Sequence, residues 1–162
     1  MRDLIAIAER IGARLKARGE SVAVSESSSG GLISAALLAV PGASVWYQGA
    51  SVTYTPNVAR GLLGLTRETM PAGVRSSTEA YALFMAGVIR EKLRGTWGLC
   101  ETGAAGPTGN PYGDAAGHSC VGVSGPVEHT ATLETGDSDR LANMFAFARF
   151  ALEQIEAVLS AS

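Results

Sequence analysis

The chain has 162 residues, of which 46% are hydrophobic and 17% are charged, and its formal net charge is −2. This length suits one domain with its own core, and this apolar content excludes an intrinsically disordered chain. Lysine and arginine are scattered rather than clustered, which argues against a nucleic-acid or membrane-surface partner. No apolar run approaches the roughly 20 residues that span a bilayer, and the first residues do not resemble a secretory signal. We therefore expect a single cytoplasmic domain over residues 1–162.

Hydrophobic periodicity predicts helices that alternate with strands. The expected helices cover residues 4–18, 32–40, 56–63, 77–93 and 140–159, and the expected strands cover residues 21–25, 50–54, 96–101, 119–123 and 129–133. This order predicts an α/β fold, namely a three-layer α/β/α sandwich around a mixed, mostly parallel sheet of about five strands. The last two strands are close enough in sequence to form an antiparallel hairpin.

Residue types that bind metals are sparse. Cys100 and Cys120 each lie in a predicted strand, which favours buried free thiols over a disulfide. His118 and His129 have no cysteine or carboxylate at ligand spacing. We therefore expect no metal and no cofactor.

The strongest local motif is a polar loop between a strand and a helix, at residues 26–31. Its sequence is Glu26-Ser27-Ser28-Ser29-Gly30-Gly31. A helix N-terminus offers unpaired N–H groups, glycines allow close approach, and three hydroxyls add donors, so the loop is a candidate phosphate site. The alternative is a capping loop whose polar side chains satisfy the backbone.

A second loop follows the strand predicted at residues 96–101 and runs to residue 116. Ligands of open α/β sheets bind where strands end, and loops of about 15 residues are usually functional. Its candidate ligand-contacting residues are Glu101, Thr102, Gly103, Ala104, Ala105 and Gly106. The alternative is a surface loop without a ligand.

Two hydroxyl-bearing residues form a third signal. Ser44 follows a Pro-Gly turn, and Tyr54 ends the next predicted strand. A serine nucleophile needs a base and an oxyanion hole, and neither is evident beside Ser44. Taken alone, Ser44 is a turn serine and Tyr54 a core tyrosine with a bonded hydroxyl.

Several separated motifs, in this order, resemble one family, the C-terminal domain of the CinA proteins. The matching stretches are Ser25-Glu26-Ser27-Ser28-Ser29-Gly30-Gly31, Pro41-Gly42-Ala43-Ser44-Val45-Trp46-Tyr47, Val52-Thr53-Tyr54-Thr55, Gly103-Ala104-Ala105-Gly106-Pro107, Gly117-His118 and Gly136-Asp137-Ser138. Together they extend over nearly the whole chain.

The resemblance implies a metal-independent nicotinamide-nucleotide amidase, which converts nicotinamide mononucleotide to nicotinic acid mononucleotide and ammonia. It implies that Ser44 is the nucleophile and that Ser27 and Tyr54 also line the site. A phosphorylated nucleotide is then the expected small-molecule partner, held by the two loops described above.

The chain departs from the family pattern at one position that matters for catalysis. The family has a lysine five residues after the tyrosine, whereas this chain has Ala59 followed by Arg60. Arginine cannot act as a base near neutral pH, but it can hold a phosphate or an oxyanion. The late family arginine is also absent from its position, Ser138, and Arg140 is its nearest substitute.

Three residues are candidates for the missing base: Glu26, Glu101 and His118. Paired carboxylates raise one pKa, and histidine titrates near neutrality. Each also has a structural alternative. Glu26 could cap backbone amides, Glu101 could pair with an arginine, and His118 could bond to a main-chain group.

Three functions follow from these patterns. The first is an amidase with catalytic residues Ser27, Ser44, Tyr54, Arg60 and Glu101. In that case Glu26, Ser28, Ser29, Gly30, Gly31, the residues 102–106 and His118 contact substrate. The second is a non-catalytic nucleotide- or partner-binding module, favoured by Ala59. The third is hydrolysis of another amide or phosphorylated metabolite.

The last predicted helix is apolar on several sides, so we expect a homodimer.

Overall fold

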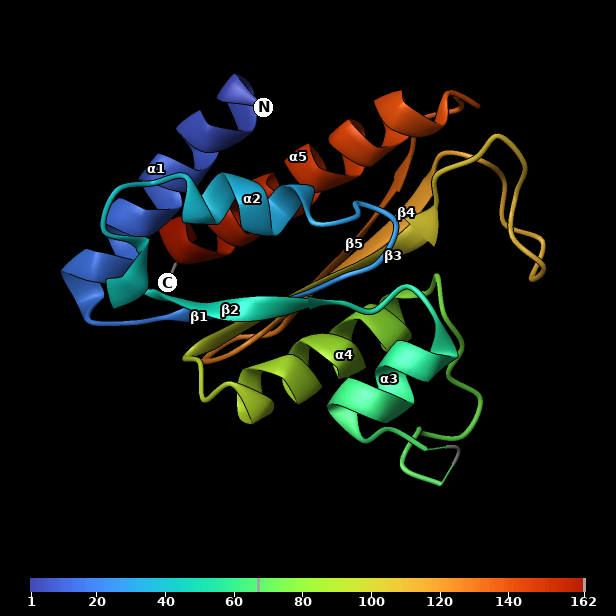
Figure 1. Cartoon of the computed structure of the whole chain (residues 1–162), viewed down its shortest axis with the longest axis horizontal. Helices are drawn as coiled ribbons and strands as arrows, with labels where there is room; N and C mark the ends of the chain where they lie inside the picture. The colour runs from blue at the N-terminus through green and yellow to red at the C-terminus, as the bar shows by residue number, and fades with distance from the viewer. Residues whose placement is uncertain (67, 162) are drawn as a thin grey trace.

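Five strands form one sheet in the order β2-β1-β3-β4-β5 (Figure 1). They are β1 (Val22–Glu26), β2 (Tyr47–Val52), β3 (Trp97–Ala104), β4 (His118–Ser124) and β5 (His129–Glu134). Strand β1 pairs in parallel with β2 and β3, whereas β4 is antiparallel to both β3 and β5. Four of the five strands thus point the same way, which confirms the mixed sheet and the final hairpin.

Helices cover both faces of this sheet (Figure 1). Helices α1 (Arg2–Arg18), α2 (Leu32–Leu38) and α5 (Arg140–Ala161) lie on one face, and α3 (Pro56–Leu63) and α4 (Glu79–Lys92) on the other. A short 3-10 helix, η1 (Ala43–Val45), leads into β2. The predicted three-layer sandwich is therefore confirmed. The computed structural model describes residues 1–66 and 68–161; the other two positions of the predicted 1–162 domain, 67 and 162, lie outside the described residues.

Two strand boundaries were predicted wrongly, and both matter for the site. Strand β2 runs from Tyr47 to Val52 instead of 50–54, because its register is set by pairing with β1, so Tyr54 lies beyond the strand end. Strand β3 continues to Ala104, because residues 102–104 pair with the start of β4. Residues 47–49 and 102–104 include polar and small residues, so the hydropathy pattern did not predict them as strand.

Apolar side chains fill both spaces between the layers. Trp46 and Trp97 are among the fully buried side chains beneath α1, α2 and α5. On the other face, α4 packs so closely that a Cβ at Gly98 would lie 1.9 Å from the Ala86 carbonyl oxygen. This close approach places the middle of α4 directly on the start of β3.

The apolar sides of α5 are covered largely by the chain itself. Phe147 and Leu152 are buried in the core, and Phe145 and Phe150 pack against it half-buried. Leu141 remains 61% exposed. The apolar sides of the last helix, on which the expected dimer rested, are thus covered largely within one chain. The homodimer stays a prediction.

Cys100 and Cys120 are free and buried, as predicted. Within residues 1–66 and 68–161, no three histidine, cysteine or acidic side chains are grouped in a way that could hold a metal ion. No helix in this described part of the chain is long and apolar enough to cross a membrane.

Candidate functional site

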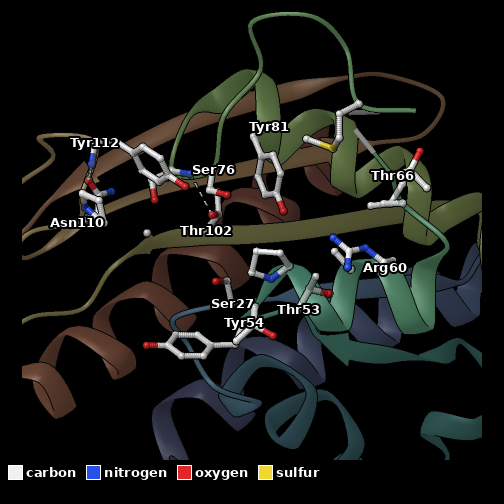
Figure 2. Close-up of a pocket in the computed structure, with 18 residues that line it drawn as sticks. Ser27, Thr53, Tyr54, Arg60, Thr66, Ser76, Tyr81, Thr102, Asn110 and Tyr112 are labelled. Atoms are coloured by element: carbon white, nitrogen blue, oxygen red, sulfur yellow. Dashed lines mark hydrogen bonds between the residues drawn. The ribbon is translucent and has the colours of Figure 1, made fainter. Parts of the chain in front are cut away.

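A pocket of about 490 Å³ opens where β1, β2 and β3 end, on the face covered by α3 and α4 (Figure 2). This volume suits a small organic ligand. The pocket is lined by Ser27, Thr53, Tyr54, Thr55, Pro56, Ala59, Arg60, Leu65, Thr66, Met70, Ser76, Ser77, Tyr81, Thr102, Gly103, Asn110, Pro111 and Tyr112.

The lining combines hydroxyl groups, aromatic rings and a single charge. Arg60 is the only charged side chain among the described lining residues, and none of them is a carboxylate, lysine or histidine. The Arg60 guanidinium is exposed and makes no hydrogen bond or ion pair with the described residues. The pocket therefore offers an uncommitted cation to an anionic ligand.

The two ends of the pocket differ in chemistry. In Figure 2, Arg60 and Thr66 lie at one end, Asn110 and Tyr112 at the other, and Ser27 and Thr102 between them. Tyr81 projects from the first turn of α4 over the middle. Burial raises the pKa of Tyr81, so its hydroxyl stays protonated at neutral pH and can donate a hydrogen bond.

An ion pair fixes the aromatic end. Arg75 donates to both carboxylate oxygens of Asp114, at 2.7 and 3.1 Å, and its guanidinium lies 5.2 Å from the centre of the Tyr112 ring. Asn110 Nδ2 donates to the same carboxylate at 2.7 Å. These bonds lower the pKa of Asp114 to about 2, with the Arg75 hydrogen bond as the main cause. The β3–β4 loop is thereby tied to the segment before α4.

Ser77 forms part of the wall in an unusual backbone conformation. Its φ is 60°, which is uncommon for a residue other than glycine. Its N–H donates to Thr102 Oγ1 at 3.2 Å, and His118 Nε2 lies 3.0 Å from its carbonyl oxygen.

His118 lies behind this wall rather than in the pocket lining. Its Nδ1 bonds the Glu134 carboxylate. Burial alone would lower the pKa of His118, but the bonds to Glu134 and to the Ser77 carbonyl outweigh burial and raise it. With both ring nitrogens engaged, His118 has the main-chain role that was its structural alternative.

Tyr54 connects the pocket with α5. Arg140, the first residue of α5, donates to the Tyr54 hydroxyl at 3.1 Å and to the Gly106 carbonyl at 2.6 Å. Arg140, the nearest substitute for the family arginine expected at Ser138, thus lies beside Tyr54, and its equivalence to that arginine stays a prediction. Asn143, one turn further along α5, donates to the Ala105 carbonyl, so residues 105 and 106 face α5 instead of the pocket.

The predicted phosphate loop is occupied by the chain's own carboxylates. Glu26 is fully buried and accepts the backbone N–H groups of Gly31, Ile33 and Ser34 at 2.8–3.0 Å. It also accepts the hydroxyl groups of Ser29 and Ser34. These are the donors that a phosphate at the start of α2 would need. The capping alternative for Glu26 is therefore confirmed.

Glu101 holds the other half of the loop. It accepts the N–H groups of Ser27 and Ser29 at 3.1 and 2.8 Å and the hydroxyl groups of Ser28 and Ser29, both at 2.8 Å. Its partners are serines, so the expected arginine pair is wrong. Burial raises the pKa of Glu101, although the bonds from Ser29, Ser28 and Ser27 oppose that effect.

Ser44 does not join the other predicted site residues. It lies exposed in η1, before β2 begins, whereas Tyr54 follows the end of β2. A strand of six residues extends about 20 Å, so the two side chains lie at opposite ends of the sheet. The expectation that Ser44 meets Ser27 and Tyr54 in one cleft is wrong, because the chain crosses the whole sheet between them.

The structure thus divides the predicted residues into two groups. Ser27, Tyr54, Arg60, Thr102 and Gly103 line the pocket. The others, which do not line it, are Glu26, Ser28, Ser29, Gly30, Gly31, Ser44, Glu101, Ala104, Ala105, Gly106 and His118. Sequence reasoning missed lining residues such as Ser77, Tyr81, Asn110 and Tyr112. Asn110 and Tyr112 lie in the second loop that the sequence singled out, and Ser77 and Tyr81 lie in the helix predicted at residues 77–93, but none of the four was named as a site residue.

Fold and site together define a small α/β domain with a ligand pocket at the carboxyl ends of its parallel strands. The family model of the CinA C-terminal domain matches residues 4–159, and the chain belongs to this family.

Known proteins of the same family are similar over most of the chain. A CinA-like protein of Synechococcus elongatus is 36% identical over 126 residues, which is 77% of this chain and 30% of that protein. A CinA-like protein of Anaeromyxobacter is 40% identical over 138 residues, which is 83% of this chain and 33% of that protein. The chain therefore spans about a third of the length of these curated relatives.

Solved structures show the same fold. A CinA superfamily protein from Klebsiella pneumoniae has a TM-score of 0.88 at 25% identity and covers 98% of this chain and 99% of its own. The competence/damage inducible protein CihA from Agrobacterium tumefaciens has a TM-score of 0.85 at 29% identity, with 98% and 96% covered.

Proposed function

We propose that the pocket binds a phosphorylated pyridine nucleotide of the nicotinamide mononucleotide class and hydrolyses its amide slowly or not at all. The observation that carries this proposal is the composition of the lining. One free cation and several hydroxyl and aromatic groups converge, whereas no described lining residue can accept a proton near neutral pH.

The lining suits each part of such a ligand. The Arg60 guanidinium can hold a phosphate through two parallel hydrogen bonds, and the Thr66 hydroxyl at the same end adds a donor. The tyrosine rings at positions 81 and 112 can contact the positively charged pyridinium ring through their faces. Thr102 and Ser27, between the two ends, can bond sugar hydroxyl groups.

Calorimetric titration with nicotinamide mononucleotide and with the riboside that lacks phosphate tests this proposal. Bonds between an arginine and a phosphate contribute about 1.5–3 kcal/mol, so we expect the riboside to bind about 10- to 100-fold more weakly. Arg60→Gln should reduce the difference between the two ligands, whereas Arg14→Gln, at an exposed position of α1, should preserve it. Equal affinity of both ligands for the wild-type protein would contradict the assignment of Arg60.

Amide hydrolysis at Ser27 is the second candidate function, and a specific observation favours it. Ser27 points into the pocket near Tyr54, and its hydroxyl makes no hydrogen bond to the described residues (Figure 2). In this reaction Ser27 Oγ would attack the amide carbon and lose its proton, the C–N bond would break, ammonia would leave, and water would hydrolyse the resulting ester.

The missing step is removal of the Ser27 proton, because Ala59 stands where the family has lysine. General-base loss lowers a rate about 10²- to 10⁴-fold, so Ala59→Lys should raise ammonia release by at least about 100-fold. Ser27→Ala in that background should abolish the release, and Ser44→Ala, at the far end of the sheet, should leave it unchanged. Substantial ammonia release by the wild-type protein would contradict the first proposal and support this one.

A further inference from the structure

Two buried carboxyl groups meet at a single hydroxyl behind the pocket. Ser29 Oγ lies 2.9 Å from Glu26 Oε2 and 2.8 Å from Glu101 Oε2. Both glutamates are 0% exposed. In the described part of the chain, the groups that bond them are backbone amides and serine hydroxyls, and none is a cation.

The protons at this junction can be counted. A serine hydroxyl has one proton and donates to one acceptor at a time. Ser29 therefore fills only one of its two short oxygen–oxygen contacts at a time, and a proton on one of the two carboxyl groups would fill the other. With both ionised, one contact would have no proton, and two negative charges would face each other away from water.

The hydrogen-bond donors indicate which group is ionised. Glu26 accepts three backbone N–H groups and Glu101 accepts two, and the remaining donors to both are serine hydroxyl groups. A hydroxyl group can rotate and accept a proton, whereas an N–H group can only donate, so the chain stabilises the negative charge better on Glu26. Burial, which raises the pKa of Glu101, acts in the same direction.

We propose that Glu26 and Glu101 share one proton through Ser29, that Glu101 carries it, and that this neutral acid positions the segment bearing Ser27. The Glu101 O–H donates to Ser29 Oγ, whose own proton is donated to Glu26. Glu101 is thus a positioning residue, because its Oε2 also accepts the Ser27 N–H.

Among residues 1–66 and 68–161, the groups around the two carboxyl groups add no compensating positive charge. Cys100 precedes Glu101 on β3, and Tyr47 on β2 interacts with Glu26; burial raises the pKa of both groups, so both are neutral at pH 7. Strand β4 contributes the Ser119 hydroxyl, and α2 contributes the Ser34 hydroxyl. From α5, Arg140 donates to Tyr54 and Gly106.

Loss of this proton should lower the free energy of unfolding as the pH rises. Glu101 is neutral in the folded protein and ionised in the unfolded chain at pH 7. The contribution to stability is therefore complete below the ordinary carboxyl pKa and is lost as the pH rises toward the raised folded pKa. One extra bound proton changes the folding equilibrium constant tenfold per pH unit in this interval. Above it, two carboxylates face each other across Ser29 and loosen residues 27–31.

Urea unfolding between pH 5 and pH 9 tests the proposal. We expect the folding constant of the wild-type protein to fall about tenfold more per pH unit than that of Glu101→Gln. Glu79→Gln is the matched control, because Glu79 also accepts two hydroxyl groups, from Thr130 and Thr132, but its pKa is lowered. It should keep the wild-type slope, and the raised pKa of His118 contributes equally to all variants. Identical slopes for wild type and Glu101→Gln would overturn the shared proton.

Infrared spectroscopy of the wild-type protein covers the case in which Glu101→Gln does not fold. A band from a neutral carboxylic acid should be present at pH 7 and disappear at high pH, and its absence at pH 7 would overturn the proposal. If the proposed function holds, affinity for nicotinamide mononucleotide should fall in the pH range where this band disappears. If the infrared band and the pH dependence of the folding constant are as expected but nicotinamide mononucleotide does not bind, the proposed function is contradicted and the shared proton is not.

Discussion

The packing of α4 on the sheet can be tested with a single methyl group. In Gly122→Ala, the new Cβ would lie 2.3 Å from the Ala82 carbonyl carbon and 2.4 Å from the Leu83 backbone nitrogen. Ordinary contacts begin at 3.4 Å, so α4 would have to move away by about 1 Å. Both obstacles are backbone atoms of a helix, which cannot rotate aside as a side chain does. We therefore expect a loss of about 3 kcal/mol in the free energy of unfolding, at the upper end for overpacked cores.

Gly61→Ala is the matched control for this substitution. Gly61 lies inside α3, and a Cβ there would meet nothing within 4 Å. Alanine is the better helix former by about 0.8–1.0 kcal/mol, so this variant should be more stable than wild type.

Urea denaturation followed by circular dichroism measures both changes. The displacement of α4 also moves Tyr81 in its first turn, so Gly122→Ala should bind nucleotide more weakly and Gly61→Ala should not. A Gly122→Ala protein within about 0.5 kcal/mol of wild type would refute the argument, because surface substitutions reach that value without any clash.

Three further predictions follow from contacts around the site. Thr78→Ala removes the side-chain cap of α4 and should cost about 1 kcal/mol in urea denaturation. Asp114→Asn removes the carboxylate whose pKa its Arg75 bond lowers from 3.8 to about 2. That group stabilises the fold above pH 3.8 and loses the effect as the pH falls toward 2, so the variant should show a smaller fall in melting temperature over this range. Cys100 and Cys120 are buried and their thiol pKa values are raised, so Ellman's reagent should label them only after unfolding, and rapid labelling of the native protein would be inconsistent with the structure.

Much of the fold could be predicted because apolar spacing determines which face of each element is buried. The helix predicted at residues 56–63 coincides with α3, since a proline opens it and Gly64 closes it in a left-handed conformation. The start of β2 and the end of β3 could not be predicted, because the residues there form strand only through hydrogen bonds to neighbouring strands.

The site was predicted in part for similar reasons. A strand end followed by a polar loop indicates an edge where ligands bind, and Ser27 and Tyr54 were found in this way. Tyr81 and Tyr112 come from segments about 30 residues apart, so their convergence depends on tertiary structure. Ser44 was misplaced because the family resemblance gives the order of motifs along the chain and not the end of the sheet at which each lies.

The internal bonds of Glu26 have a practical consequence for solution work. Since the amides at the start of α2 already have a permanent anionic occupant, inorganic phosphate or sulfate in a buffer has no reason to accumulate there. A gain in melting temperature with added phosphate that is larger in the wild-type protein than in Arg60→Gln would then report on the Arg60 end of the pocket, because the general stabilising effect of phosphate is common to both proteins. Thermal shift measurements in phosphate on these two proteins could thus probe the anion-binding end of the pocket before any nucleotide is tested.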